Sequence, residues 1–228
     1  MKHYYKFLEY KDGKIVSAHG DQEWEIGKEY SVSGKVEACE NGFHASETIV
    51  QALSYVNGNV LAVVTASGDS DNRYDKVYYR SITIKRAYHW RLEDSIALAI
   101  YAAEQVVGIF EDEYPNDPRP RDAIKAAKAY LRCIHNGTEV SAYAATNAER
   151  AAYNSARAAT YARAADSAYA AIAAAYAACA VDAARDACAD NAARAARAAA
   201  DAARAVNDEI KSAIDRWCLS RIKKLERI

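Results

Sequence analysis

The residues best suited to chemistry lie in one short block, Cys39-Glu40-Asn41-Gly42-Phe43-His44-Ala45-Ser46. Asn-Gly is typical of a turn, and Ser46 is placed to cap a helix that we expect over residues 47–56. A turn that carries a His just before a helix suits an anion such as a phosphate, because the free amides and the helix dipole favour negative charge there. The block therefore predicts a ligand site formed by Gly42, Phe43, His44 and Ser46.

A structural role is the alternative for the same block. In that interpretation Gly42 makes a turn, Phe43 packs in the core and His44 is a hydrogen-bonded structural residue. A lone His with one nearby Cys specifies no reaction, and the chain has no Walker motif, Gly-x-Gly-x-x-Gly, Gly-x-Ser-x-Gly or His-Glu-x-x-His. The five Cys are widely spaced without a Cys-x-x-Cys, which argues against a disulfide framework or a zinc ribbon. We therefore expect no metal and no cofactor, and we favour a protein that is not an enzyme.

The elements that position this block form an expected α+β domain over residues 1–88. Asp12-Gly13 predicts a hairpin between two of its strands, and Gly34 predicts a turn between two others. The polar stretch 67–75 is expected to be a loop. The expected strands cover residues 4–10, 14–18, 29–32, 35–38, 60–65 and 77–84.

A helical domain is expected over residues 89–228. All nine Gly and all three Pro lie in the first 137 residues, and the rest is rich in Ala. Asp and Arg recur every three or four positions from Asp186 to Asp215, which predicts one amphipathic helix with a charge-balanced, solvated stripe through at least residue 217. The expected helices cover about 92–112, 119–135, 138–181 with a break, and 182–226, as a bundle or a long helical hairpin. The heavier apolar end of the last helix can serve as a contact in a homo-oligomer.

Bulk properties limit the classes of partner. The formal net charge of −1 argues against general nucleic-acid binding and against a polybasic membrane binder. The longest uncharged run of the helical half, residues 167–181, is short and weakly hydrophobic for a membrane span. The first residues have no apolar core of the signal-peptide type. We expect a cytoplasmic protein with no membrane contact.

Two stretches resemble known families. Trp24, the block 39–46, the strand 59–66 and Asp75-Lys76-Val77 resemble a domain of unknown function seen in phage and prophage proteins, over about residues 4–88. On this resemblance Trp24 and Lys76 join the expected site residues. The run from Glu113 to Tyr130, EYPNDPRPRDAIKAAKAY, resembles an alanine-rich helical immunity-protein family, over about residues 92–228. These resemblances imply a bacterial or phage setting, in the host cytoplasm if phage-encoded, and a theme of protein antagonism or defence.

A third resemblance concerns nucleotide chemistry. The turn with His44 and Ser46, the helix with Ala52 and Tyr55, and the strand 60–65 look like part of the ADP-ribosyltransferase core. That resemblance implies that His44 and Ser46 touch the nicotinamide ribose of NAD. The family's catalytic Glu has no assigned counterpart in this chain.

Three functions remain open at this point. The first is a non-enzymatic binding protein, immunity-like or anti-defence, whose partner is a toxin, a defence component or a small nucleotide-type signal. The second is an ADP-ribosyltransferase-like domain that handles NAD or a nucleotide at residues 39–46. The third is a structural or assembly protein that acts through its helical half.

Overall fold

Two compact units make up the chain in the computed structural model. The structure describes residues 2–20, 22–37, 40–53, 55–56, 58–73, 76–136 and 189–228, together with residues 169, 172, 173, 176 and 179. The first unit comprises Met1–Trp90 and Cys218–Ile228, and the second comprises Arg91–Trp217. The chain therefore leaves the first unit after Trp90 and returns to it at Cys218.

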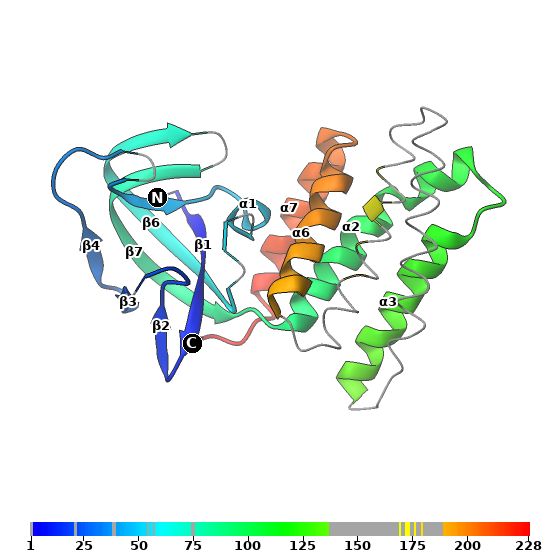
Figure 1. The fold of residues 1–228 in the computed structure, drawn as a ribbon, viewed down its shortest axis with the longest axis horizontal. Helices are drawn as coiled ribbons and strands as arrows, with labels where there is room; N and C mark the ends of the chain where they lie inside the picture. The colour runs from blue at the N-terminus through cyan, green and yellow to red at the C-terminus, as the bar shows by residue number, and fades with distance from the viewer. Residues whose placement is uncertain are drawn as a thin grey trace. The chain divides into compact units, whose positions relative to one another are not determined.

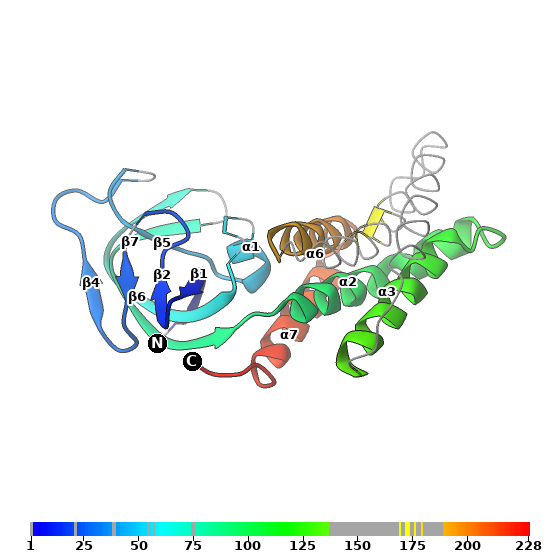
Figure 2. The same cartoon turned by 60° about the horizontal axis from the view of Figure 1, so that its bottom comes forward.

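An antiparallel sheet of seven strands forms the first unit and curves strongly, as a half barrel (Figures 1 and 2). Its order is β3 (Glu23–Trp24), β2 (Lys14–Val16), β1 (Tyr4–Lys11), β6 (Val60–Arg73), β7 (Lys76–His89) and β4 (Glu29–Ser31), with β5 (Phe43–Ala45) also on β7. The predicted hairpin of β1 and β2 is confirmed. Asp12 and Gly13 both have positive φ, 51° and 79°, which is the turn geometry that Asp-Gly favours.

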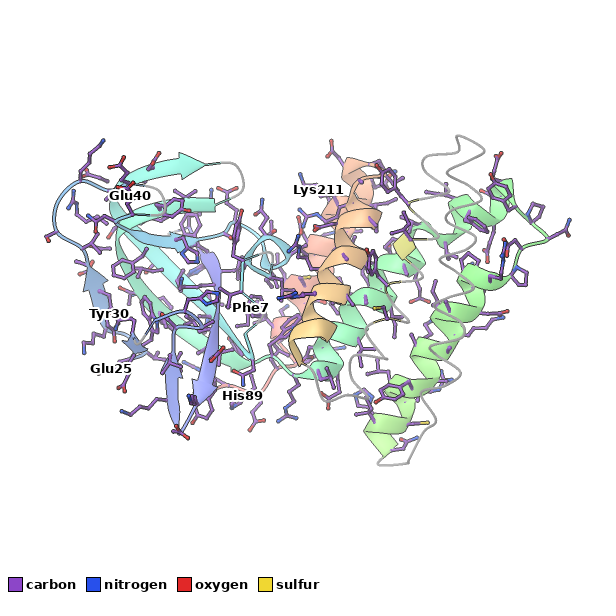
Figure 3. The ribbon with its side chains drawn as sticks, in the orientation of Figure 1. Phe7, Glu25, Tyr30, Glu40, His89 and Lys211 are labelled. Carbon is purple, nitrogen blue, oxygen red and sulfur yellow. The ribbon has the colours of Figure 1, made fainter. Side chains whose placement is uncertain are left out.

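A bridge between Tyr5 and Ser46 joins the two sides of this curved sheet. The Tyr5 amide donates to the Ser46 carbonyl at 2.8 Å, and the Ser46 amide donates to the Tyr5 carbonyl at 3.0 Å. Ser46 directly follows β5, which pairs with β7, whereas Tyr5 lies in β1. The enclosed core includes Tyr4, Leu8, Trp24, Val60, Val64, Ile82 and Ile84. The opposite face of β1 carries Phe7 (labelled in Figure 3), which meets the Trp90 ring edge-on at 5.5 Å.

The prediction of a strand over residues 35–38 is wrong for residues 35–37, the part of it that the structure describes. β4 pairs with β7, where Glu29 lies opposite Thr83. The Asn41 side chain holds residues 33–35 instead, because Asn41 Nδ2 donates to the carbonyls of Ser33 and Lys35 at 2.7 and 2.8 Å. Side-chain bonds of this kind compete with a strand ladder.

The loop predicted over residues 67–75 is also wrong in its described part. β6 continues to Arg73 and pairs with β7 along its length, with irregularities between Val63 and Val64 and between Ser67 and Ser70. One face of an antiparallel hairpin can be solvated, so polar residues alone do not mark a loop. The predicted strands 60–65 and 77–84 are therefore parts of two longer strands of 14 residues each, and 60–65 is the first part of β6.

The helix predicted over residues 47–56 is shorter, α1 (Ile49–Leu53), and Thr48 caps it instead of Ser46. The Gln51 amide donates to Thr48 Oγ1 at 3.2 Å, and the Thr48 amide donates to Gln51 Oε1 at 3.0 Å. This reciprocal pair is a capping box. His44 lies in β5, five residues before α1 begins, so the strand and not the helix start positions it; the anion site itself stays a prediction.

Two long helices open the second unit, as the periodicity and the proline loop predict. They are α2 (Leu92–Glu113) and α3 (Arg119–Asn136). Asp117 ends the connecting loop, and its carboxylate accepts the Arg119 amide at 3.2 Å. Two ion pairs link α2 to α3, Glu111 with Arg121 and Glu104 with Lys128. No described helix combines the length and apolar character needed to cross a bilayer.

The single helix predicted over residues 182–226 is wrong, because the structure has two helices there. α6 (Ala189–Arg204) ends before Asn207, and α7 (Asp208–Ile222) begins after it. Asn207 Oδ1 accepts the Ile210 amide at 2.9 Å, so Asn207 caps the new helix. The spacing of charged residues keeps its period of 100° per residue across the break between α6 and α7. The charge stripe therefore gave no sign of the break.

The fold class is α+β, as predicted: an antiparallel sheet followed by helices. The expected helix over 138–181 lies almost wholly outside the described residues, and the expected bundle or long helical hairpin stays a prediction. The C-terminal residues add a pairing that the sequence did not suggest. The His89 amide donates to the Glu226 carbonyl at 2.9 Å, and the Ile228 amide donates to the Ala87 carbonyl at 3.0 Å.

Candidate functional site

Trp24 and Phe43, two of the expected site residues, meet in the curved sheet. Their ring centroids are 5.6 Å apart. The Trp24 ring also contacts that of Tyr30 in β4 (labelled in Figure 3), with centroids 4.8 Å apart. The Trp24 side chain is 5% exposed, and its indole N–H donates to Ser17 Oγ at 2.9 Å. The hydrogen bond gives the indole N–H a partner, and Trp24 is part of the core.

Lys6 is a buried lysine on the inner face of β1. It lies between Tyr4 and Leu8, two residues of the core, and only 8% of it is exposed. Its Nζ lies 3.3 Å from His44 Nε2 and 3.4 Å from the His44 carbonyl oxygen. The same Nζ is 5.9 Å from the centre of the Trp24 ring. β1, β3 and β5 thus bring a lysine, a tryptophan and a histidine together.

The contact between Lys6 and His44 constrains their protonation. A charged ammonium has three donors and no acceptor, so His44 Nε2 accepts and the imidazole carries its hydrogen on Nδ1. A second proton on the imidazole would put two positive charges at 3.3 Å in a largely buried place, which is unfavourable.

Two tyrosine rings flank His44. The centroid of Tyr78, the residue opposite His44 in the β5–β7 pairing, lies 6.2 Å away, and that of Tyr55 lies 6.4 Å away. We call Lys6, Trp24, His44, Tyr55 and Tyr78 the Lys6–His44 cluster. Trp24 and Tyr78 are buried members of this cluster, whereas Tyr55 is partly exposed and offers a flat surface for a base or another planar group beside His44.

Gly42 has a backbone conformation that favours glycine directly before β5. Its φ is +148°, and a Cβ at this position would lie 3.2 Å from Val36 Cγ1 and 3.5 Å from the Tyr79 carbonyl oxygen. A glycine is favoured here because other residues rarely adopt this φ, and a Cβ would also require a small shift of the Val36 side chain. Gly42 therefore supports the cluster by helping to place His44. This is a structural role, as in the alternative interpretation of the block.

Ser46 and Lys76 have different positions. Ser46 is 1% exposed, and its backbone makes the bridge to Tyr5. Lys76 is the first residue of β7, and its backbone pairs with Arg73, whereas its side chain lies outside the described residues. Cys39 and Asp75, which belong to the motifs quoted above, also lie outside them.

Neighbouring tyrosines add a hydrogen bond at the edge of the core. Burial raises the pKa of Tyr79, and a hydrogen bond with Tyr4 raises it further. The two rings lie 5.2 Å apart. Tyr79 therefore stays protonated at neutral pH, so it can donate a hydrogen bond but does not act as a base.

Sequence reasoning missed Lys6 and Tyr78. Lys6 interrupts the apolar run Tyr4-Tyr5-Lys6-Phe7-Leu8, and period-2 alternation puts it on the same face as Tyr4 and Leu8. A lysine on the core face of a strand was therefore a readable signal. Tyr78 could not be placed from the sequence, because its position opposite His44 depends on the β5–β7 register.

Comparisons with known proteins match one part of the chain. Residues 9–93 match the model of a family described as a domain of unknown function, DUF7666. The match includes Trp24, His44, Tyr55 and Tyr78 and begins after Lys6. Neither the curated proteins nor the solved structures contain a match to this chain.

Proposed function

We propose that this chain is a non-enzymatic binding protein whose first unit holds a small nucleotide-type anion at the Lys6–His44 cluster. The observation that carries the proposal is the 3.3 Å contact between two basic nitrogens, one of them on a side chain that is 8% exposed. A phosphate oxygen placed beside both nitrogens would accept from each of them. It would also favour the second proton on the pair, because an opposite charge stabilises the charged forms.

The aromatic residues favour a nucleotide over a bare phosphate. Tyr55 is the partly exposed ring of the cluster and lies beside His44, and stacking on an aromatic ring is worth about 1–3 kcal/mol per base. A ligand with a planar base and a phosphate therefore uses both parts of the cluster. The immunity-like or anti-defence setting implied by the two family resemblances fits a protein that captures such a signal or binds a toxin or defence component.

A thermal-shift panel tests the proposal on the full chain. NAD, ADP-ribose, cyclic mononucleotides, cyclic dinucleotides and inorganic phosphate are each titrated against the wild type, His44→Ala and Lys6→Met. His19→Ala and Lys11→Met are matched controls, because both side chains are exposed in the same unit and Lys11 lies on the same strand as Lys6. We expect a concentration-dependent rise in Tm with at least one nucleotide, reduced in both cluster variants and unchanged in both controls.

Several outcomes overturn the proposal. No shift with any nucleotide contradicts it, and so does an equal shift in His44→Ala and His19→Ala. Lys6→Met could unfold the protein because it replaces a buried residue, so His44→Ala, at a half-buried position, carries the comparison. Release of nicotinamide from NAD would replace the binding function with the ADP-ribosyltransferase-like alternative.

A further inference from the structure

The second unit contains a groove between α2 and α3 that no comparison assigns and the proposed function does not use. Its volume is about 300 Å³. α2 contributes Tyr101 and Glu104, α3 contributes Lys128, Arg132 and His135, and α7 contributes Trp217. We call this the α2–α3 groove. All of these residues belong to the second unit.

One wall of the groove is an aromatic pair. The rings of Tyr101 and Trp217 are stacked, with centroids 5.2 Å apart and planes 17° from parallel. Both side chains are partly exposed, so the stack does not lie wholly in the core. A flat, apolar ligand would extend such a stack.

The other wall is basic. Lys128, Arg132 and His135 occur at intervals of four and three residues, so they share one face of α3. Lys128 is paired with Glu104, the one acidic residue of the groove. Arg132 has no ion pair to any residue in the described part of the chain. The groove therefore has a positive charge that its own carboxylate does not balance.

His135 adds a donor at the end of this wall. Its Nδ1 lies 2.8 Å from the Leu131 carbonyl oxygen, and since a carbonyl only accepts, Nδ1 carries a hydrogen. Nε2 is then the nitrogen that is left for a ligand, and it donates when it also carries a hydrogen. The bond to Leu131 also covers one carbonyl of the last helical turn, which would otherwise repel an anion.

From this combination we propose that the α2–α3 groove binds a small aromatic anion, a planar ring that carries a phosphate or a carboxylate. The ring lies against Tyr101 and Trp217, and the anion lies between Arg132 and His135. The volume of about 300 Å³ is at the lower end of the range for small-molecule sites, so it suits a one- or two-ring compound.

Titration by isothermal calorimetry tests this site with four probes and the full chain. The probes are 1-naphthyl phosphate, 1-naphthoate, inorganic phosphate and 1-naphthol, which present ring with phosphate, ring with carboxylate, anion alone and ring alone. We expect one of the two ring anions to bind at least tenfold more tightly than inorganic phosphate and 1-naphthol. The stronger of the two identifies the anionic group.

Three variants locate the binding. Arg132→Gln and His135→Gln change exposed side chains, and each is expected to weaken binding at least fivefold. Lys125→Gln is the matched control: it removes one exposed positive charge from the same helix outside the groove, and binding should not change. The same titration in His44→Ala should also give unchanged binding, which separates this groove from the Lys6–His44 cluster.

The inference is wrong if Arg132→Gln and Lys125→Gln bind alike, or if neither ring anion binds. Binding of inorganic phosphate as tight as that of the ring anions would reduce the site to a charged patch and would also overturn it. Loss of binding in His44→Ala alone would place the probe in the first unit and count against the groove, while leaving the proposed function standing.

Discussion

Lys6 shows how one side chain changes the interpretation of a strand. It occupies a core-facing position between Tyr4 and Leu8, where an apolar residue would contribute about 1.5–3 kcal/mol on burial. A lysine there carries a desolvation cost, which contacts with His44 and the Trp24 ring reduce. Residues that lower stability in a core are concentrated at functional sites, and the buried Lys6 therefore supports the proposed ligand site at the Lys6–His44 cluster.

The substitution Gly42→Ala tests whether β5 depends on a glycine. Its φ of +148° is rarely adopted by other residues, and the new Cβ would lie 3.2 Å from Val36 Cγ1. Strain of this kind costs about 1–3 kcal/mol. We expect the free energy of unfolding to fall by that amount in urea denaturation, with weaker nucleotide shifts because His44 is two residues away.

The control for this prediction is Gly108→Ala in α2. A Cβ at Gly108 meets no atom within 4 Å, and alanine is favoured over glycine in a helix by about 1 kcal/mol. Gly108→Ala should therefore be neutral or stabilising. If Gly42→Ala is equally well tolerated, the backbone conformation at Gly42 is not what fixes His44.

At the scale of elements, one of the two ion pairs between α2 and α3, Glu111 with Arg121, is expected to contribute to stability in a way that depends on pH. The Arg121 guanidinium hydrogen-bonds Glu111 and holds the pKa of that carboxylate below its ordinary value. The folded state then binds fewer protons than the unfolded state, so the pair stabilises the protein above the ordinary pKa of Glu. This stabilisation is lost as the pH falls through the lowered pKa.

The substitution Glu111→Gln measures this contribution. The two side chains are 34% and 39% exposed, so we expect a loss of only about 0.5–1 kcal/mol in the free energy of unfolding at pH 7. The difference from the wild type should be full above the ordinary Glu pKa of 4.5 and shrink toward zero as the pH falls through the lowered pKa of Glu111. Glu113→Gln, at an exposed position in the last turn of α2, should differ little from the wild type at every pH. A constant difference for Glu111→Gln would contradict the assignment.

Local signals in the sequence identified some elements and not others. The β1–β2 hairpin and α2 were predictable because Asp-Gly and a long apolar stripe act over a few residues. The capping box Thr48-Ile49-Val50-Gln51 was equally local, and it could have replaced Ser46 as the expected cap. The pairing of β4 with β7 was not predictable, since it joins residues about 50 positions apart and no turn motif specifies it.

The candidate site was predictable only in part, for the same reason. His44, Phe43 and Trp24 were expected from the sequence, and the structure brings Trp24 and Phe43 into contact. The neighbours that give His44 a chemical environment, Lys6 and Tyr78, come from β1 and β7. Residue types can suggest a member of a site, whereas the register of distant strands determines its partners.

At the scale of the whole molecule, the first unit needs a segment from the far end of the chain. The outer edge of β7 is covered in turn by β5, by β4 and, opposite Tyr88, by Arg227. The sequence predicts one domain boundary, near residue 88. The two compact units of the structure have two boundaries, one after Trp90 and one before Cys218. A fragment that ends near residue 93, like the family match, lacks this last edge partner.

Deletion of residues 226–228 tests this dependence in the full chain. It removes the bonds of 2.9 Å from His89 to Glu226 and of 3.0 Å from Ile228 to Ala87. It also removes Ile228 from its packing against the core of the first unit. Each hydrogen bond contributes about 0.5–1.5 kcal/mol, so we expect the first unit to lose about 1–3 kcal/mol in unfolding free energy.

The measurement is urea unfolding followed by tryptophan fluorescence, with hydrogen exchange at the His89 amide as a local probe. Arg227→Ala is the control, because it keeps the backbone that makes both bonds and alters only a side chain. The deletion should speed exchange at His89, whose amide would no longer have its carbonyl partner, and Arg227→Ala should not. Equal exchange rates in the wild type and the deletion would show that β7 is stable without residues 226–228, and the dependence of the first unit on this last edge partner would be wrong.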